Sequence, residues 1–161
     1  VCYHFAMAHI HEKIDFTASV FIVYGDKVLL HMHKKLGIWL QPGGHIELHE
    51  DPVEAVLREA KEESGLDVEL VGKTPESLNT KFGARELMVP RYMNRHFFDE
   101  AHTHEHIDMV YFARAMSDAA VPEAGGGEVR WFTKAELQNP ALDLLPDVHK
   151  YALAALEELA E

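Results

Sequence analysis

Three glutamates, Glu59, Glu62 and Glu63, have the type and spacing needed to hold a metal ion. Residues three or four apart on a helix are neighbours, so these carboxylates would share one face of a helix. Like charges at that separation destabilise a helix and raise one another's pKa, and a bound cation offsets that cost. Carboxylate oxygens favour Mg²⁺ or Mn²⁺ over zinc. The alternative interpretation is a solvated acidic face, which is common on surface helices.

The helix that carries these glutamates is predicted over residues 51–64. Asp51 is a good N-cap, Pro52 suits the first turn, Glu54 completes a capping box, and Gly65 marks the end. A second stripe at steps of three and four is predicted to face the core and consists of Val53, Val56, Leu57, Ala60 and Ser64.

Further elements are predicted on both sides of that helix. Runs of β-branched and apolar residues predict strands over 17–24 and 28–33, and then over 66–71, 91–98, 106–115 and 129–132. Between 39 and 46, a tight loop flanked by short extended pieces is predicted at Pro42-Gly43-Gly44. Thr133 caps a helical turn through Leu137, and apolar residues from Val148 to Leu159 follow the spacing of a terminal helix. Strands that bracket helices predict a mixed sheet between helical layers.

The spacing of the acidic helix and its glycine-rich approach resembles the Nudix box, Gly-x5-Glu-x7-Arg-Glu-U-x-Glu-Glu-x-Gly-U, in which U is a bulky apolar residue. The matching residues are Gly44, Glu50, Arg58, Glu59, Glu62, Glu63, Gly65 and Leu66. Ala60 stands where a larger aliphatic residue is commoner, and this is a packing position. The resemblance implies an α/β fold of the Nudix type, an α/β/α sandwich with a central mixed sheet.

The resemblance also implies roles for individual residues. Glu59, Glu62, Glu63 and the backbone carbonyl of Gly43 match metal ligands, and Arg58 matches the arginine that positions the box carboxylates. Glu50 would orient and support them. The catalytic residues are then expected to be Glu59, Glu62 and Arg58. The general base would be Glu59 or Glu62, or a residue of a loop outside the box, since family members also recruit a base from there. Family members often add one carboxylate from a later region, for which Glu105 is the first candidate and Asp108 the next.

The expected activity is Mg²⁺-dependent hydrolysis of a phosphoanhydride bond in a nucleoside diphosphate derivative, with Mn²⁺ as a substitute metal. A nucleoside triphosphate is slightly favoured, and nucleotide sugars and dinucleoside polyphosphates stay open. A catalytically silent nucleotide sensor of the same fold would be expected to lose box carboxylates, and all of them are present. An isopentenyl diphosphate isomerase would need a catalytic cysteine, and Cys2 lacks matching surroundings.

A run of histidines, His102, His104 and His106, lies outside the box. In an extended segment these side chains share one face, where they could contact phosphate or metal. A polar segment leading into a buried strand is the interpretation that we favour, and a structural role is expected for His31 and His33 as well. Trp131 and Phe132 are expected in the core, and Arg85, Arg91 and Arg95 are candidate phosphate contacts.

Length and composition fit one Nudix domain over 1–161, with residues 1–15 as a peripheral extension. The net charge of −12 argues against nucleic acid and anionic membranes as partners, so a small-molecule nucleotide substrate is expected. The single cysteine and the lack of a signal-peptide pattern predict a cytoplasmic protein. A homodimer is among the assemblies left open.

Overall fold

The fold is built around β1 (Ile14–Tyr24), a long buried strand in the centre of a mixed sheet. A computed structural model describes residues 12–73, 75–76, 78, 80–122, 124 and 126–161. Along the main path of the sheet the order is β3-β2-β1-β7-β5, with β4, β6 and β8 paired to β1, β7 and β2. The strands are β2 (Lys27–His33), β3 (Ile38–Leu40), β4 (Gly43–His45), β5 (Val68–Leu70), β6 (Tyr92–Phe97), β7 (Glu105–Ala115) and β8 (Val129–Thr133). β1 runs parallel to β7 and antiparallel to β2 and β4.

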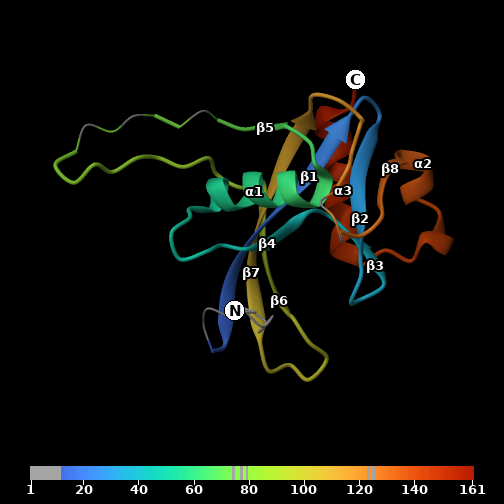
Figure 1. Cartoon of the computed structure of the whole chain (residues 1–161), viewed down its shortest axis with the longest axis horizontal. Helices are drawn as coiled ribbons and strands as arrows, with labels where there is room; N and C mark the ends of the chain where they lie inside the picture. The colour runs from blue at the N-terminus through green and yellow to red at the C-terminus, as the bar shows by residue number, and fades with distance from the viewer. Residues whose placement is uncertain (1–11, 74, 77, 79, 123, 125) are drawn as a thin grey trace.

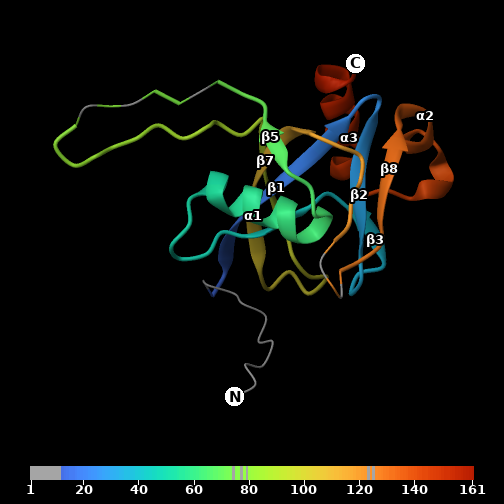
Figure 2. The same cartoon turned by 45° about the horizontal axis from the view of Figure 1, so that its top comes forward.

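Helices cover both faces of this sheet (Figures 1 and 2). On one face α1 (Pro52–Ser64) packs its Ala55, Val56 and Ala60 against alternate residues of β1 and β7. On the other face α3 (Pro146–Leu159) covers a second core that includes Phe21 and Phe112. A short helix, α2 (Lys134–Leu137), and a 3-10 turn, Pro140–Leu142, lie between β8 and α3. The predicted α/β/α sandwich is confirmed.

The ends of α1 follow the local signals in its sequence. The Asp51 side chain accepts hydrogen bonds from the backbone N–H groups of Val53 and Glu54, and the Glu54 carboxylate accepts from the backbone of Asp51. Gly65 ends the helix in the left-handed conformation, with φ of 71°. These caps fix where the helix begins and ends, and thus which side chains face the sheet.

Two local predictions were wrong. Gly43 and Gly44 lie in β4, paired with Ser19 and Ala18 of β1, rather than in a tight loop. A Cβ on Gly43 would overlap both side-chain and backbone atoms of Ser19, so the two strands approach closely because the residue is glycine. Leu57 was placed on the buried stripe of α1, yet it is 39% exposed because Ala55 takes the inward position.

The first residues of the predicted N-terminal extension fall outside the described part of the chain, which begins at residue 12. The last two, Ile14 and Asp15, belong to β1, and Asp15 is buried. Figures 1 and 2 show the described residues between β5 and β6 projecting from the sheet as a long arm. None of the helices in the described residues is long and apolar enough to cross a membrane.

Candidate active site

Arg58 joins the acidic residues of the box into one network. Its Nε donates to Glu50 Oε1 at 2.7 Å and its Nη2 donates to Glu50 Oε2 at 3.0 Å. Its Nη1 donates to Glu59 Oε1 at 2.7 Å and to Glu62 Oε2 at 3.2 Å. The bidentate contact with Glu50 lowers the pKa of that carboxyl and raises the pKa of the guanidinium. Arg58 therefore donates hydrogen bonds to three carboxylates of the box.

Glu59 lies against the glycine strand β4. A Cβ on Gly44 would overlap the Oε1 and Cδ atoms of Glu59, so this glycine leaves room for the carboxylate. Burial raises the pKa of Glu59, partly offset by the hydrogen bond from Arg58. Glu62, one turn further along α1, has a side chain that is 44% exposed.

Glu63 lies half-buried beside β4, with a side chain that is 27% exposed. Its Oε2 accepts a hydrogen bond from the Gly43 N–H at 2.9 Å. Burial, and then repulsion by Glu59 and Glu62, raise the pKa of Glu63 to about 8. The Nε2 atom of His31 lies 3.5 Å from the same oxygen, and burial lowers the pKa of His31 to about 4. His31 is therefore neutral at pH 7 and does not neutralise Glu63.

The box thus holds more carboxyl groups than cationic groups. Glu50, Glu59, Glu62 and Glu63 gather around one guanidinium, and two of these carboxylates are buried enough to have raised pKa values. Carboxylate oxygens are the donors that Mg²⁺ binds, and a divalent cation would supply the missing positive charge. The donor set on α1 therefore fits such an ion.

Glu105 is not brought to this network. Its two oxygens accept hydrogen bonds from Arg95 Nε at 2.5 Å and Nη2 at 2.6 Å, at the start of β7. Both oxygens of Glu105 are therefore engaged by Arg95. Asp108, the next candidate, is buried on β7 and accepts hydrogen bonds from the hydroxyl groups of Thr17 and Ser19.

The other predicted contacts have structural partners. Arg85 pairs with Asp51, and Arg91 pairs with Glu158.

Phe132 is fully buried, as predicted, while Trp131 is partly buried and packs against the core under α1. Cys2 lies outside the described residues.

Sequence reasoning missed the position of His31 beside Glu63. The contact arises because β2, which carries His31, and β4, which lies against Glu63, both pair with β1. The spacing of residues along the sequence does not indicate which strands are paired.

Comparison with known proteins agrees with this fold. A model of the NUDIX domain matches residues 14–156. A hydrolase of the NUDIX family from Clostridium perfringens is 38% identical, covers 89% of this chain and 97% of its own, and superposes with a TM-score of 0.77. The chain belongs to the Nudix family of hydrolases.

More distant relatives add the following likenesses. A MutT NUDIX hydrolase from Burkholderia pseudomallei shares the fold, with a TM-score of 0.61, 24% identity and coverage of 92% of this chain and 100% of that one. A probable DHNTP pyrophosphohydrolase from Lactococcus lactis subsp. cremoris is 33% identical over 64 residues, which are 40% of this chain and 39% of that protein. The match to that relative therefore spans less than half of its length.

Proposed function

We propose that this Nudix hydrolase uses Mg²⁺ to cleave a phosphoanhydride bond in a nucleoside diphosphate derivative, with a nucleoside triphosphate as the preferred substrate. The observation that carries the proposal is the placement of Glu59 and Glu63, two half-buried carboxyl groups with raised pKa values, against the glycine strand β4. Such a site gains most from a ligand that brings divalent positive charge. The pyrophosphohydrolase name of the Lactococcus lactis relative supports the bond type.

Glu59, Glu62, Glu63 and the Gly43 carbonyl would hold Mg²⁺. When bound, Mg²⁺ neutralises charge on the diphosphate and favours ionisation of an attacking water. Arg58 keeps the Glu59 and Glu62 carboxylates in place through its 2.7 Å and 3.2 Å hydrogen bonds. Glu62 is the more accessible of the two candidate bases, since its side chain is 44% exposed and that of Glu59 is 14% exposed. We assign proton removal from water to Glu62.

We place the nucleobase of the substrate in a pocket of about 280 Å³ near the start of α1. It is lined by Asp15, Phe16, Ile46, Glu47, Leu48, Pro52 and Met109. Phe16 is 44% exposed there, and an exposed aromatic face suits stacking on a nucleobase. Because Ile46 directly follows His45 at the end of β4, this pocket lies a few residues from the box glycines.

The test is incubation with a panel of substrates and Mg²⁺ in ¹⁸O-labelled water, with products identified by mass. The panel contains nucleoside triphosphates, DHNTP, nucleotide sugars and dinucleoside polyphosphates. We expect pyrophosphate release from a triphosphate, with the label showing which phosphorus water attacks, and loss of turnover by orders of magnitude in Glu62→Gln and Glu63→Gln. Inertness across the whole panel, with nucleotide binding retained, would contradict the proposal and favour a silent sensor.

The pocket is tested separately with Phe16→Ala. We expect a higher KM for the preferred substrate with a smaller change in kcat, because Phe16 would contact the nucleobase and not the reacting phosphate. An unchanged KM would place the base elsewhere and leave the hydrolytic assignment intact.

A further inference from the structure

A second cluster of metal-ligating side chains lies outside the carboxylate network of the box. Asp15 of β1 and His106 of β7 are register partners in the parallel pair, so their side chains leave the sheet on the same face. His104 directly precedes β7. All three are buried, with 1%, 6% and 7% of Asp15, His104 and His106 exposed, and one ligand atom of each lies within 4.8 Å of the others.

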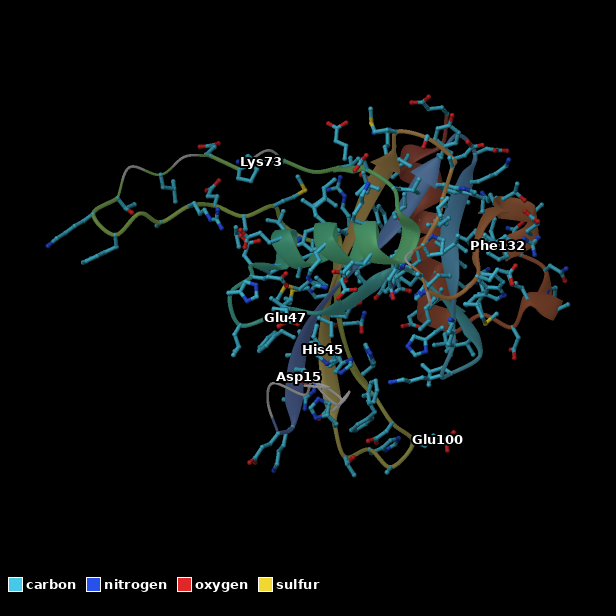
Figure 3. All side chains as sticks on the ribbon, in the orientation of Figure 1. Asp15, His45, Glu47, Lys73, Glu100 and Phe132 are labelled. Carbon is cyan, nitrogen blue, oxygen red and sulfur yellow. The ribbon has the colours of Figure 1, made fainter. Side chains whose placement is uncertain are left out.

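His45 from β4 approaches the same carboxylate. Its Nε2 atom lies 3.4 Å from Asp15 Oδ2, and the Nε2 atom of His104 lies 3.1 Å from that oxygen. The rings of His45 and His106 are 4.9 Å apart between centroids. Figure 3 shows Asp15 and His45 next to each other below α1. In tetrahedral zinc sites with bonds of about 2.0 Å, two ligand atoms are about 3.3 Å apart, which matches both separations.

The hydrogen bonding of His104 also suits a metal ligand. Its Nδ1 lies 3.4 Å from the carbonyl oxygen of Glu12, and only a protonated Nδ1 can interact favourably with a carbonyl. Nε2 of the same ring faces the Asp15 carboxylate at 3.1 Å, and either a proton or a metal cation between these two atoms would satisfy both. A carbonyl partner on the far nitrogen is the usual arrangement around a metal-ligating histidine.

His106 supplies an independent observation. Its Nε2 atom is buried and has no hydrogen-bond partner among the residues that the structure describes. A buried imidazole nitrogen without a partner is costly in a folded protein, and a bound metal would satisfy it.

We propose that Asp15, His104 and His106, with His45 as the fourth ligand, form a zinc site distinct from the Mg²⁺ site on α1. Imidazole nitrogens favour zinc over Mg²⁺, so ligand chemistry separates the two sites. A set of four protein ligands is typical of a structural zinc ion. The site would fix the glycine strand, because His45 follows Gly43 and Gly44 and its carbonyl accepts a hydrogen bond from Arg58 Nη2 at 3.1 Å.

The test uses untagged full-length protein, stripped with a chelator and then titrated with Zn²⁺, or with Co²⁺ as a spectroscopic probe. We expect one equivalent to bind, the visible absorption of tetrahedral Co²⁺, and a higher unfolding temperature with zinc. Asp15→Asn, His104→Gln and His106→Gln should each lose this binding. His102→Asn is the matched control, since His102 belongs to the same histidine run but is exposed and stacks on Phe97.

A second control tests whether the cysteine and histidines of residues 1–11, which could also bind zinc, contribute to the binding. A full-length variant carrying Cys2→Ser, His4→Gln, His9→Gln and His11→Gln should keep its zinc. If the ligand variants fail to fold, X-ray absorption of the zinc-loaded wild-type protein decides, and nitrogen and oxygen ligands are expected. The proposal is overturned if the wild type binds less than a tenth of an equivalent, if the ligand variants retain zinc, or if sulfur is found in the first shell.

Discussion

Replacing Glu63 with glutamine is expected to stabilise the metal-free protein while abolishing its function. Folding buries this carboxylate and raises its pKa from 4.5 to about 8. At pH 7 the group must stay charged in a desolvated position or take up a proton. Each pKa unit corresponds to about 1.4 kcal/mol, so the interval from 4.5 to 7 costs the fold up to about 3 kcal/mol. Because the side chain is 27% exposed, we expect a gain of about 1–3 kcal/mol in Glu63→Gln.

The sign of the pH dependence follows from the raised pKa. Below pH 4.5 the carboxyl is protonated in both states and carries no penalty, and between 4.5 and about 8 the penalty grows as pH rises. Glutamine avoids it and still accepts the hydrogen bond from the Gly43 N–H. Urea unfolding in magnesium-free buffer at pH 5 and pH 7 should therefore show a larger difference from wild type at pH 7.

The matched control is Glu62→Gln, which makes the same chemical change at a side chain that is 44% exposed. It should change the stability of the metal-free protein much less. Adding Mg²⁺ should stabilise the wild type, by mass action, much more than Glu63→Gln. A Glu63→Gln variant that is no more stable than wild type at pH 7, or whose gain is the same at pH 5, would refute the reasoning.

Three further substitutions test how the fold positions the site. Val56→Ala should lower the free energy of unfolding by roughly 1–3 kcal/mol, because Val56 is fully buried, whereas Leu57→Ala should cost far less, as urea unfolding would show. Asp51→Ala should cost about 1 kcal/mol through loss of the α1 cap, and an unchanged unfolding midpoint would speak against that cap. Gly44→Ala should reduce kcat/KM at least tenfold by displacing Glu59, with circular dichroism unchanged; wild-type kinetics would show that the close approach is dispensable.

Local signals in the sequence were sufficient to predict α1 and its carboxylates. The cap at Asp51, the stop at Gly65 and the spacing of the glutamates act within a few residues, so each can be read without knowing the rest of the fold. The inward face of α1 was less predictable. Ala55 is fully buried and Leu57 is 39% exposed, whereas the apolar pattern placed Leu57, and not Ala55, on the inward face.

Long-range strand pairing explains what the sequence did not reveal. Asp15 and His104 are 89 positions apart, and their contact depends on the parallel register of β1 and β7. Glu105 was chosen for its carboxylate alone, whereas Arg95 on the paired strand β6 binds it. Such partners depend on which strands are neighbours, and residue spacing along the chain does not determine that.

The most direct test of the proposed mechanism is a crystal structure with Mg²⁺ and a non-hydrolysable nucleoside triphosphate analogue. The account predicts Mg²⁺ bound by carboxylates of Glu59, Glu62 and Glu63 and by the Gly43 carbonyl, in contact with phosphate oxygens of the analogue. Phosphates bound away from α1, with these carboxylates free of metal at saturating Mg²⁺, would contradict it.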